Sequence, residues 1–504
     1  MNTIEEVLAL EDISKKISYL KKGRRTPLPN TLENLKDWDI RGHNVFDKEK
    51  RKDNTIVTTE EKTIFDDKTG KTRVEPAKKE SELVNRIGIP LEQDIVNIQT
   101  AFTVGIEPTL DCTPNDDGEK NLLSALKAVF QYCKLKFQNK KIVRSWLSEQ
   151  EVAEYWYVVV DDSFWSKVWR KIKYTFTGKN GPTAKLKSVL WSPFRGDKLF
   201  PFFDESGDMV AFSREYKRKD LDDKEIECFM VITKDSVLHY ESETQWELKV
   251  EKSFKHNLPK LPVIYSYRRE PYCRKIKTFR ERLETLLSNY ADCIDYHFFP
   301  LLKLIGDVDG ISGKRKDRMV KLTGQGADAQ YLTWDQVPDT VKFEAETLTD
   351  MAYSMTGTPR ISFKDLQGTG NALSGVSFRY AFMGAHMAVS NHAEDLGEFF
   401  QRRVNFLVAA LGSINSGFYK PSQTIDINTE IVPFMIDNID DKVSTAVTAV
   451  EGGIWSTREG IMFAGNADRV EEELKEIKEK QQIKSEKQDT KPKDGQKNIG
   501  DNTK

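Results

Sequence analysis

Residues 337–412 read VPDTVKFEAETLTDMAYSMTGTPRISFKDLQGTGNALSGVSFRYAFMGAHMAVSNHAEDLGEFFQRRVNFLVAALG and contain a helical pattern, a broken segment and a second helical pattern. In the first part, apolar residues recur at spacings of four and three from Val341 to Met355. This spacing predicts one face of a helix. Gly357 and Pro359 follow directly and predict its end.

The segment after this helix contains Gly357, Gly368 and Gly370, which is too much glycine for regular structure. From Leu373 to Leu411 apolar residues return, and no proline interrupts them. That pattern predicts a helix of roughly 55–60 Å at the usual rise per residue. The order is therefore helix, mobile loop and very long helix.

These motifs resemble the tunnel-loop region of tailed-bacteriophage portal proteins. The resemblance rests on Thr356-Gly-Thr-Pro359, on Gly368-Thr-Gly-Asn-Ala-Leu-Ser-Gly375 and on the long aromatic-rich helix that follows. A second specific match lies at 443–480, where Gly-Gly-Ile and a Ser-x-x-Glu capping box precede a Glu-rich helix. By the order of its elements, the resemblance extends over residues 81–483.

The resemblance implies an α+β, mainly helical portal-protein fold, with long stem and wing helices, a β-rich wing and a small α/β clip, assembled as a cyclic ring. The parts it implies are a wing (1–275), a first stem helix (276–302), a clip (303–336), a second stem helix (337–356), a tunnel loop (357–372), a long wing helix with a strand (373–440), a crown (441–483) and a disordered tail (484–504).

Hydrophobic patterns predict the elements inside these parts. Helices are expected from Leu8 to Leu20, at 81–103, 122–138 and 142–153, and in a stem stripe from Phe279 to Phe298. Strands are expected at 55–59 and 424–435, and in a β-rich region over 156–268 at 154–160, 186–191, 209–216, 228–232, 236–240, 246–250 and 260–265. Further helices are expected at 442–450 and 470–480, with Ser456 and Glu459 forming a capping box.

Composition agrees with a channel through which DNA slides. The 504 residues indicate about three domains. The 77 basic and 79 acidic side chains leave a net charge of −2, whereas a dedicated duplex-binding protein is usually more basic. Because each neutralised phosphate adds affinity, a strongly basic channel would hold DNA instead of releasing it.

The five cysteines are scattered without a CxxC pair, which argues against a disulfide framework and a zinc site and favours a reducing compartment. The charged segment Met1–Leu20 is unlike a signal peptide. No apolar run approaches the ~18 residues of a membrane span, so no membrane partner is expected.

A basic group in the implied clip is the first candidate contact site. It consists of Lys314, Arg315, Lys316 and Arg318. The resemblance places these residues toward the terminase or DNA, and a solvated turn is the alternative.

The implied tunnel loop is the second candidate site. Arg360 and Lys364 would touch phosphates of the passing duplex without reading bases. Gly368 and Gly370 would keep the loop mobile. The alternative is an ordinary mobile surface loop.

No catalytic set emerges from the sequence. The segment from Gly310 to Arg315 has glycines only three apart and lacks the Ser or Thr of a phosphate loop. The six histidines show no metal-ligand spacing. We therefore expect no enzymatic activity, no metal and no cofactor.

The resemblance implies a dodecameric channel at one capsid vertex for DNA packaging and ejection. Its implied partners are copies of itself, double-stranded DNA, the terminase large subunit, a head-completion or adaptor protein, and the major capsid and scaffolding proteins. The implied location is the virion, after assembly in the host cytoplasm. The alternatives are a packaging-associated nuclease or ATPase component and a monomeric helical adaptor, which the native mass would distinguish.

Overall fold

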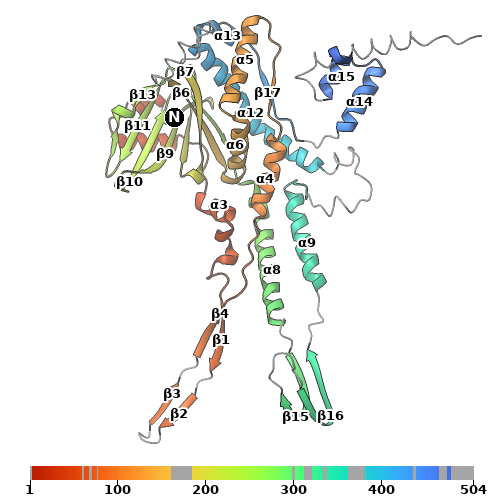
Figure 1. Ribbon diagram of the computed structural model, residues 1–504. Helices are drawn as coiled ribbons and strands as arrows, with labels where there is room; N and C mark the ends of the chain where they lie inside the picture. Colours follow the sequence, from red (N-terminus) through yellow and green to blue (C-terminus); the bar gives the residue numbers. More distant parts are fainter. Residues whose placement is uncertain are drawn as a thin grey trace, which may run out of the picture. The chain divides into compact units, whose positions relative to one another are not determined.

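The computed structural model has a mixed α+β fold with antiparallel sheets (Figure 1). It divides into two compact units, Met1–Arg360 with Phe382–Phe434, and Ile361–Ala381 with Met435–Lys504. The residues that the structure describes are 3–59, 62–66, 71–75, 78–160, 184–297, 301–311, 320–332, 338–360, 380, 382–434, 439–464 and 474–477.

The first helical segment is two helices, α1 (Ile4–Leu8) and α2 (Ile13–Lys22), so the expectation of one continuous helix from Leu8 to Leu20 is wrong. Asp12 causes the break, because its side chain accepts a hydrogen bond from the Lys15 backbone at 3.1 Å and caps α2. A third helix, α3 (Thr31–Trp38), follows, with the short 3₁₀ turns η1 (Ile40–Gly42) and η2 (Asn44–Phe46).

Two antiparallel strand pairs follow these helices, and in the chain one pair lies between the two strands of the other. Strand β1 (Asn54–Thr59) pairs with β4 (Lys78–Glu82), and β2 (Lys62–Asp66) pairs with β3 (Lys71–Glu75). The strand expected at 55–59 is therefore confirmed.

The expected β-rich region forms two antiparallel sheets. One is ordered β12-β11-β10-β9-β8, with β13 also paired to β11, and the other is β14-β6-β7. The strands are β6 (Glu151–Val160), β7 (Ala184–Trp191), β8 (Lys198–Phe203), β9 (Met209–Lys219), β10 (Glu225–Ile232), β11 (Ser236–Ser242), β12 (Trp246–Leu248), β13 (Phe254–Lys255) and β14 (Val263–Tyr267). Strand β8 was not expected from the sequence.

Alternation along β10 places a core on each face of the larger sheet. Met230 and Ile232 pack with residues of the smaller sheet, including Trp191. Phe229 and Val231 pack instead with residues of α1 and α2. Successive strand residues point to opposite faces, so both faces of this sheet are buried.

The first helix after strands β1–β4 begins later than the sequence pattern predicted. Helix α4 (Leu91–Val104) begins after Pro90, and the residues just before it lie in β4 and in irregular chain. The expected helix over 81–103 therefore starts too early. Proline at this point lacks an amide hydrogen and suits a helix start.

The helices expected at 122–138 and 142–153 have different limits. The structure has α5 (Asp117–Tyr132) and α6 (Leu135–Glu149), and β6 begins two residues after α6. Lys134 separates the helices with a φ of 53°, a left-handed conformation that the pattern of apolar residues does not reveal.

Two long helices lie side by side (Figure 1). They are α8 (Lys277–His297), which follows the short η5 (Tyr272–Ile276), and α9 (Pro338–Met355). The Tyr272 hydroxyl, just before α8, donates to the Thr356 carbonyl, just after α9, so the helices run antiparallel. Arg282 of α8 also pairs with Glu344 of α9 at 2.7 Å.

Strands β15 (Leu301–Ile311) and β16 (Val320–Leu332) form an antiparallel pair between these helices in the chain. Residues 301 and 302 are therefore strand, and the helix expected to reach 302 ends earlier. All described residues from 301 to 332 are strand, whereas an α/β clip was expected.

The long helix expected from Leu373 is observed as α12 (Met383–Ile414). Residues 373–379 lie outside the described chain. After α12 come η6 (Ser416–Phe418), α13 (Pro421–Thr424) and β17 (Asn428–Glu430), which pairs with β5 (Thr109–Asp111). The strand expected over 424–435 is thus reduced to three residues.

In the smaller unit, α14 (Ile439–Glu451) and α15 (Thr457–Phe463) are described. Ser456 and Glu459 form the expected capping box at the start of α15. Residues 474–477 are helical, and the rest of 470–480 and the tail lie outside the described residues. Among described helices, none has the length and apolarity that crossing a membrane requires.

Candidate functional site

The candidate site is built on the chain that leaves α9. Thr356 ends this helix and its hydroxyl donates to the Ala352 carbonyl at 2.9 Å. Gly357 follows with a φ of +57°, the left-handed conformation that often terminates helices. The Thr358 amide then donates back to the Tyr353 carbonyl at 2.9 Å. The Gly-x-Pro signal in the sequence therefore marks a tightly closed helix end.

Two side chains from distant helices hold this helix end, which we call the loop root (Thr356–Thr358). Gln99 of α4 donates to the Thr358 hydroxyl at 2.8 Å and to the Thr356 carbonyl at 3.1 Å. Tyr272 donates to the same carbonyl. Gln99, Thr356 and Thr358 are all buried, and buried hydrogen bonds of this kind fix the position of a segment because breaking them leaves polar groups unpaired.

The loop root also touches the start of α12. A Cβ added to Gly357 would lie 2.7 Å from the Gly384 carbonyl oxygen, and one added to Gly384 would lie 3.4 Å from the Gly357 oxygen. Both glycines therefore permit two stretches of backbone to meet. The chain leaves α9 and enters α12 at one place, so the 26 positions between these two glycines (358–383) begin and end side by side.

A buried aromatic group lies next to the loop root. The His392 ring is 5.0 Å from Tyr272 and 5.7 Å from Trp146 between ring centroids. Burial, together with the charges of Arg268 and Lys275, lowers the pKa of His392 to about 3. Burial also raises the pKa of Tyr272 to about 12. Both groups are therefore neutral near neutral pH, so His392 packs and Tyr272 donates its hydrogen bond without carrying charge.

Of the expected loop contacts, Arg360 lies within the described residues. Its guanidinium pairs with Asp350 of α9 at 2.7 Å, and both side chains are substantially exposed. An exposed pair of this kind contributes little to stability. It still gives Arg360 a carboxylate partner within the same subunit, which the sequence did not indicate.

The other expected site residues lie outside the described chain. These are Lys364, Gly368 and Gly370 of the implied tunnel loop, and Lys314, Arg315, Lys316 and Arg318 of the implied clip. Their roles stay predictions.

Sequence reasoning missed the residues that hold the loop root. Gln99 and Tyr272 lie 257 and 84 positions from Thr356, and each sits in an ordinary helical or turn pattern. Gly384 was visible as a glycine within a helical pattern, which often marks close packing.

No group of three or more His, Cys, Asp or Glu arranged to hold a metal exists among the described residues.

A family model described as "Phage portal protein, SPP1 Gp6-like" matches residues 31–487. That match covers both units of the structure, including the α8–α9 pair and the loop root. Among curated proteins, none matches the chain.

Proposed function

The chain belongs to the SPP1 Gp6-like family of phage portal proteins, and on that premise we propose that copies of it close into a dodecameric ring at one capsid vertex. Portal proteins of this family form a channel for DNA packaging and are not enzymes. A separate terminase then supplies the motor, and the ring supplies the passage for packaging and ejection.

The observation that best supports a ring is the exposed apolar surface of α9. Phe343 is 71% exposed, although α9 packs against α8. Met351 and Met355 of the same helix are also exposed. Burying such a side chain contributes about 1.5–3 kcal/mol. Side-by-side packing of these helices around a ring would cover this surface, because ring symmetry joins two different faces of each subunit.

The parts of the subunit follow from this arrangement. Helices α8 and α9 would be the stem, the β15–β16 hairpin the clip, and α14 and α15 part of the crown. The two sheets and the helices around α12 would be the wing. A head-completion or adaptor protein would dock at the clip side, and capsid and scaffolding proteins around the wing, all within the virion vertex that assembles in the host cytoplasm.

The loop root supports a channel-facing role for the segment that follows it. Because this segment starts and ends at the Gly357–Gly384 contact, both of its ends are anchored to buried structure. Lys364, Gly368 and Gly370 belong to that segment. Each loop would make weak phosphate contacts, since strong ones would slow DNA movement. Arg360 would join them only by exchanging its Asp350 partner for a phosphate.

Native mass measurement tests the ring directly. A complex near twelve times 57.9 kDa is expected. A monomer at every protein concentration and salt concentration would contradict the proposed ring and favour a monomeric adaptor.

Replacing Lys314, Arg315, Lys316 and Arg318 with serine is expected to leave the ring intact and to weaken terminase docking. Charges at the rim of an interface mainly accelerate association, so the loss should be largest at low salt. The measurement is packaged DNA in a reconstituted reaction over a salt series. Equal packaging by variant and parent at every salt concentration would show that these cations are only solvated surface charges.

A further inference from the structure

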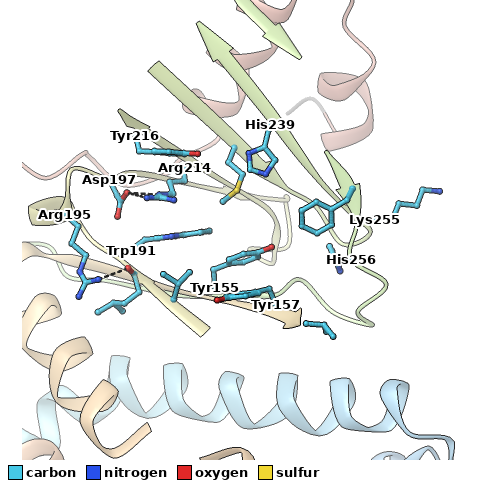
Figure 2. A pocket seen from close by; sticks show the side chains of 15 residues that line it. Tyr155, Tyr157, Trp191, Arg195, Asp197, Arg214, Tyr216, His239, Lys255 and His256 are labelled. Atoms are coloured by element: carbon cyan, nitrogen blue, oxygen red, sulfur yellow. Dashed lines mark hydrogen bonds and ion pairs between the residues drawn. The ribbon is translucent and has the colours of Figure 1, made fainter. Parts of the chain in front are cut away.

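An open cleft of about 750 Å³ lies between the two sheets of the β-rich region (Figure 2). Residues of β6, β7, β9, β10, β11 and β13 line it. We call it the aromatic cleft, and it is separate from the loop root and from the α8–α9 pair. Nothing in the family match assigns it a ligand.

Stacked rings form the apolar wall of the cleft. Tyr155 stacks on Trp191 with centroids 4.9 Å apart and on Tyr157 with centroids 5.9 Å apart. Arg214 covers the other part of the wall, with its guanidinium carbon 4.8 Å from the Trp191 ring, and it pairs with Asp197 at 2.7 Å. The wall therefore presents apolar surface, together with an arginine whose charge Asp197 neutralises.

The ends of the cleft carry positive charge. Figure 2 shows Arg195 at one end and Lys255 at the other. Neither forms an ion pair with any described residue, and both are exposed. His256 adds no contact for an occupant, because its Nε2 lies 3.0 Å from the Thr233 carbonyl and its Nδ1 accepts from the Leu258 amide. A fitting occupant is thus apolar in its middle and acidic on both sides.

The turn between β9 and β10 has this chemistry. Leu221 at its tip is 102% exposed, so its side chain touches almost nothing of its own subunit. Asp220 and Asp222 flank it, and neither has an ion-pair partner among described residues, whereas Asp223 pairs with Lys219 at 3.5 Å. We call Asp220–Asp223 the acidic tip.

The pairing of its own strands holds the acidic tip away from its own cleft. Strands β9 and β10 stay paired in register as far as Lys219 and Glu225, the residues beside the turn. The turn itself is closed by a hydrogen bond from the Asp220 amide to the Lys224 carbonyl at 3.0 Å. Tyr216 of the same β9 strand lines the cleft. The tip therefore extends past its own cleft and is available to another molecule.

We propose that the acidic tip of one subunit inserts Leu221 into the aromatic cleft of a second copy of this chain. The inference rests on the proposed ring and deepens it by naming a contact between neighbours. Asp220 and Asp222 would then face Arg195 and Lys255. Tip and cleft are different surfaces, and a contact between different surfaces repeats head to tail until the ring closes.

Charge-reversal variants of the full chain test this contact. Asp220→Lys with Asp222→Lys reverses the tip, and Arg195→Glu with Lys255→Glu reverses the cleft. Sedimentation velocity gives the protein concentration at which half of the subunits are in rings and half have dissociated. Each reversal is expected to raise that concentration by about tenfold or more, a loss of about 1.4 kcal/mol, and the combination of both is expected to return it to within about threefold of the parent.

Leu221→Asp should raise the same concentration by about tenfold, and Leu221→Met should change it little, because Met can fill the same apolar space. Leu32→Asp is the matched control, since Leu32 is also strongly exposed but belongs to α3 and not to the β9–β10 turn. All variants alter exposed residues, and an unchanged thermal unfolding midpoint checks their folding.

The outcomes separate the contact from the ring. Suppose that the parent forms rings but the combined reversal raises the half-dissociation concentration by the product of the two single effects. Then the tip does not enter the cleft, and the portal function stands. The same conclusion follows if Leu221→Asp changes this concentration no more than Leu32→Asp does. If reversal of the cleft raises this concentration and reversal of the tip does not, the cleft meets another surface of the neighbouring subunit and the inference is wrong. If the parent never forms rings, the proposed assembly itself fails.

Discussion

Replacing Arg403 with alanine is expected to lower the free energy of unfolding by about 3–5 kcal/mol, because it leaves a buried carboxylate without its cation. Arg403 lies on α12 and its Nε donates to Glu154 of β6 at 2.6 Å. Its Nη1 donates to Asn139 of α6 at 2.6 Å. The side chains of Arg403 and Glu154 are 2% and 0% exposed. One guanidinium therefore joins two helices to the smaller sheet.

Arg402→Ala is the matched control for this variant. Arg402 is the preceding residue on the same helix, and it forms an exposed pair with Glu398 one turn away. Its loss should change stability by about 0.5 kcal/mol or less. Urea unfolding followed by tryptophan fluorescence compares the two, since Trp156 packs near α12 through Phe406. Equal midpoints for both variants would contradict a structural role for the buried ion pair.

A double variant refines this test. Replacing Arg403 with Met and Glu154 with Leu removes both charges together and should be less destabilising than Arg403→Ala. Apolar residues of similar volume often replace a buried ion pair at small cost. Asn139 and Gln138 each lose a partner in that variant, so some loss of stability should remain.

Local signals in the sequence predicted local structure well. Gly357 and Pro359 marked the end of α9, and Ser456 with Glu459 marked the start of α15. Each of these signals acts within one turn of backbone, so neighbouring residues suffice to read it. The stem stripe predicted α8 for the same reason, because helical periodicity is a property of the segment itself.

Long-range contacts were not predictable from the same patterns. Arg403 reads as one of two adjacent arginines on a helix, yet Arg402 is exposed and Arg403 is buried against Glu154, 249 positions away. The left-handed conformation of Lys134 was likewise not readable from its residue type, since non-glycine residues rarely adopt that conformation.

At the candidate site, too, the sequence revealed the local features and not the long-range contacts. The sequence marked the loop by its glycines, and Gly357 does occupy a conformation that requires glycine. It did not reveal Gln99 and Tyr272, whose hydrogen bonds hold the loop root. Arg360 looked free to meet phosphate, but Asp350 lies ten positions earlier in the sequence and reaches it only because the chain turns sharply at Gly357.

Gly357→Ala is the second substitution with a large expected effect, a loss of about 2–5 kcal/mol of stability. Two separate causes add. A φ of +57° is unfavourable for alanine by about 1–2 kcal/mol. The new Cβ would also stand 2.7 Å from the Gly384 carbonyl oxygen, which is backbone and cannot rotate away as a side chain would. Forced overpacking of this kind costs a further ~1–3 kcal/mol.

Gly397→Ala on α12 is the control. It replaces a glycine that has neither the positive φ nor the close backbone contact of Gly357. A Cβ at Gly397 meets nothing within 4 Å, and the residue is helical, so alanine should stabilise the protein by about 0.5–1 kcal/mol. Thermal unfolding of both variants beside the parent gives opposite shifts if the loop root is as closely packed as described. Because the Gly357–Gly384 contact brings together both ends of the segment implied to face DNA, rings that survive Gly357→Ala should also package less DNA than Gly397→Ala rings. A Gly357→Ala protein with the parent's stability would mean that α9 and α12 separate readily at this point, and that the loop has no fixed root from which to meet the duplex.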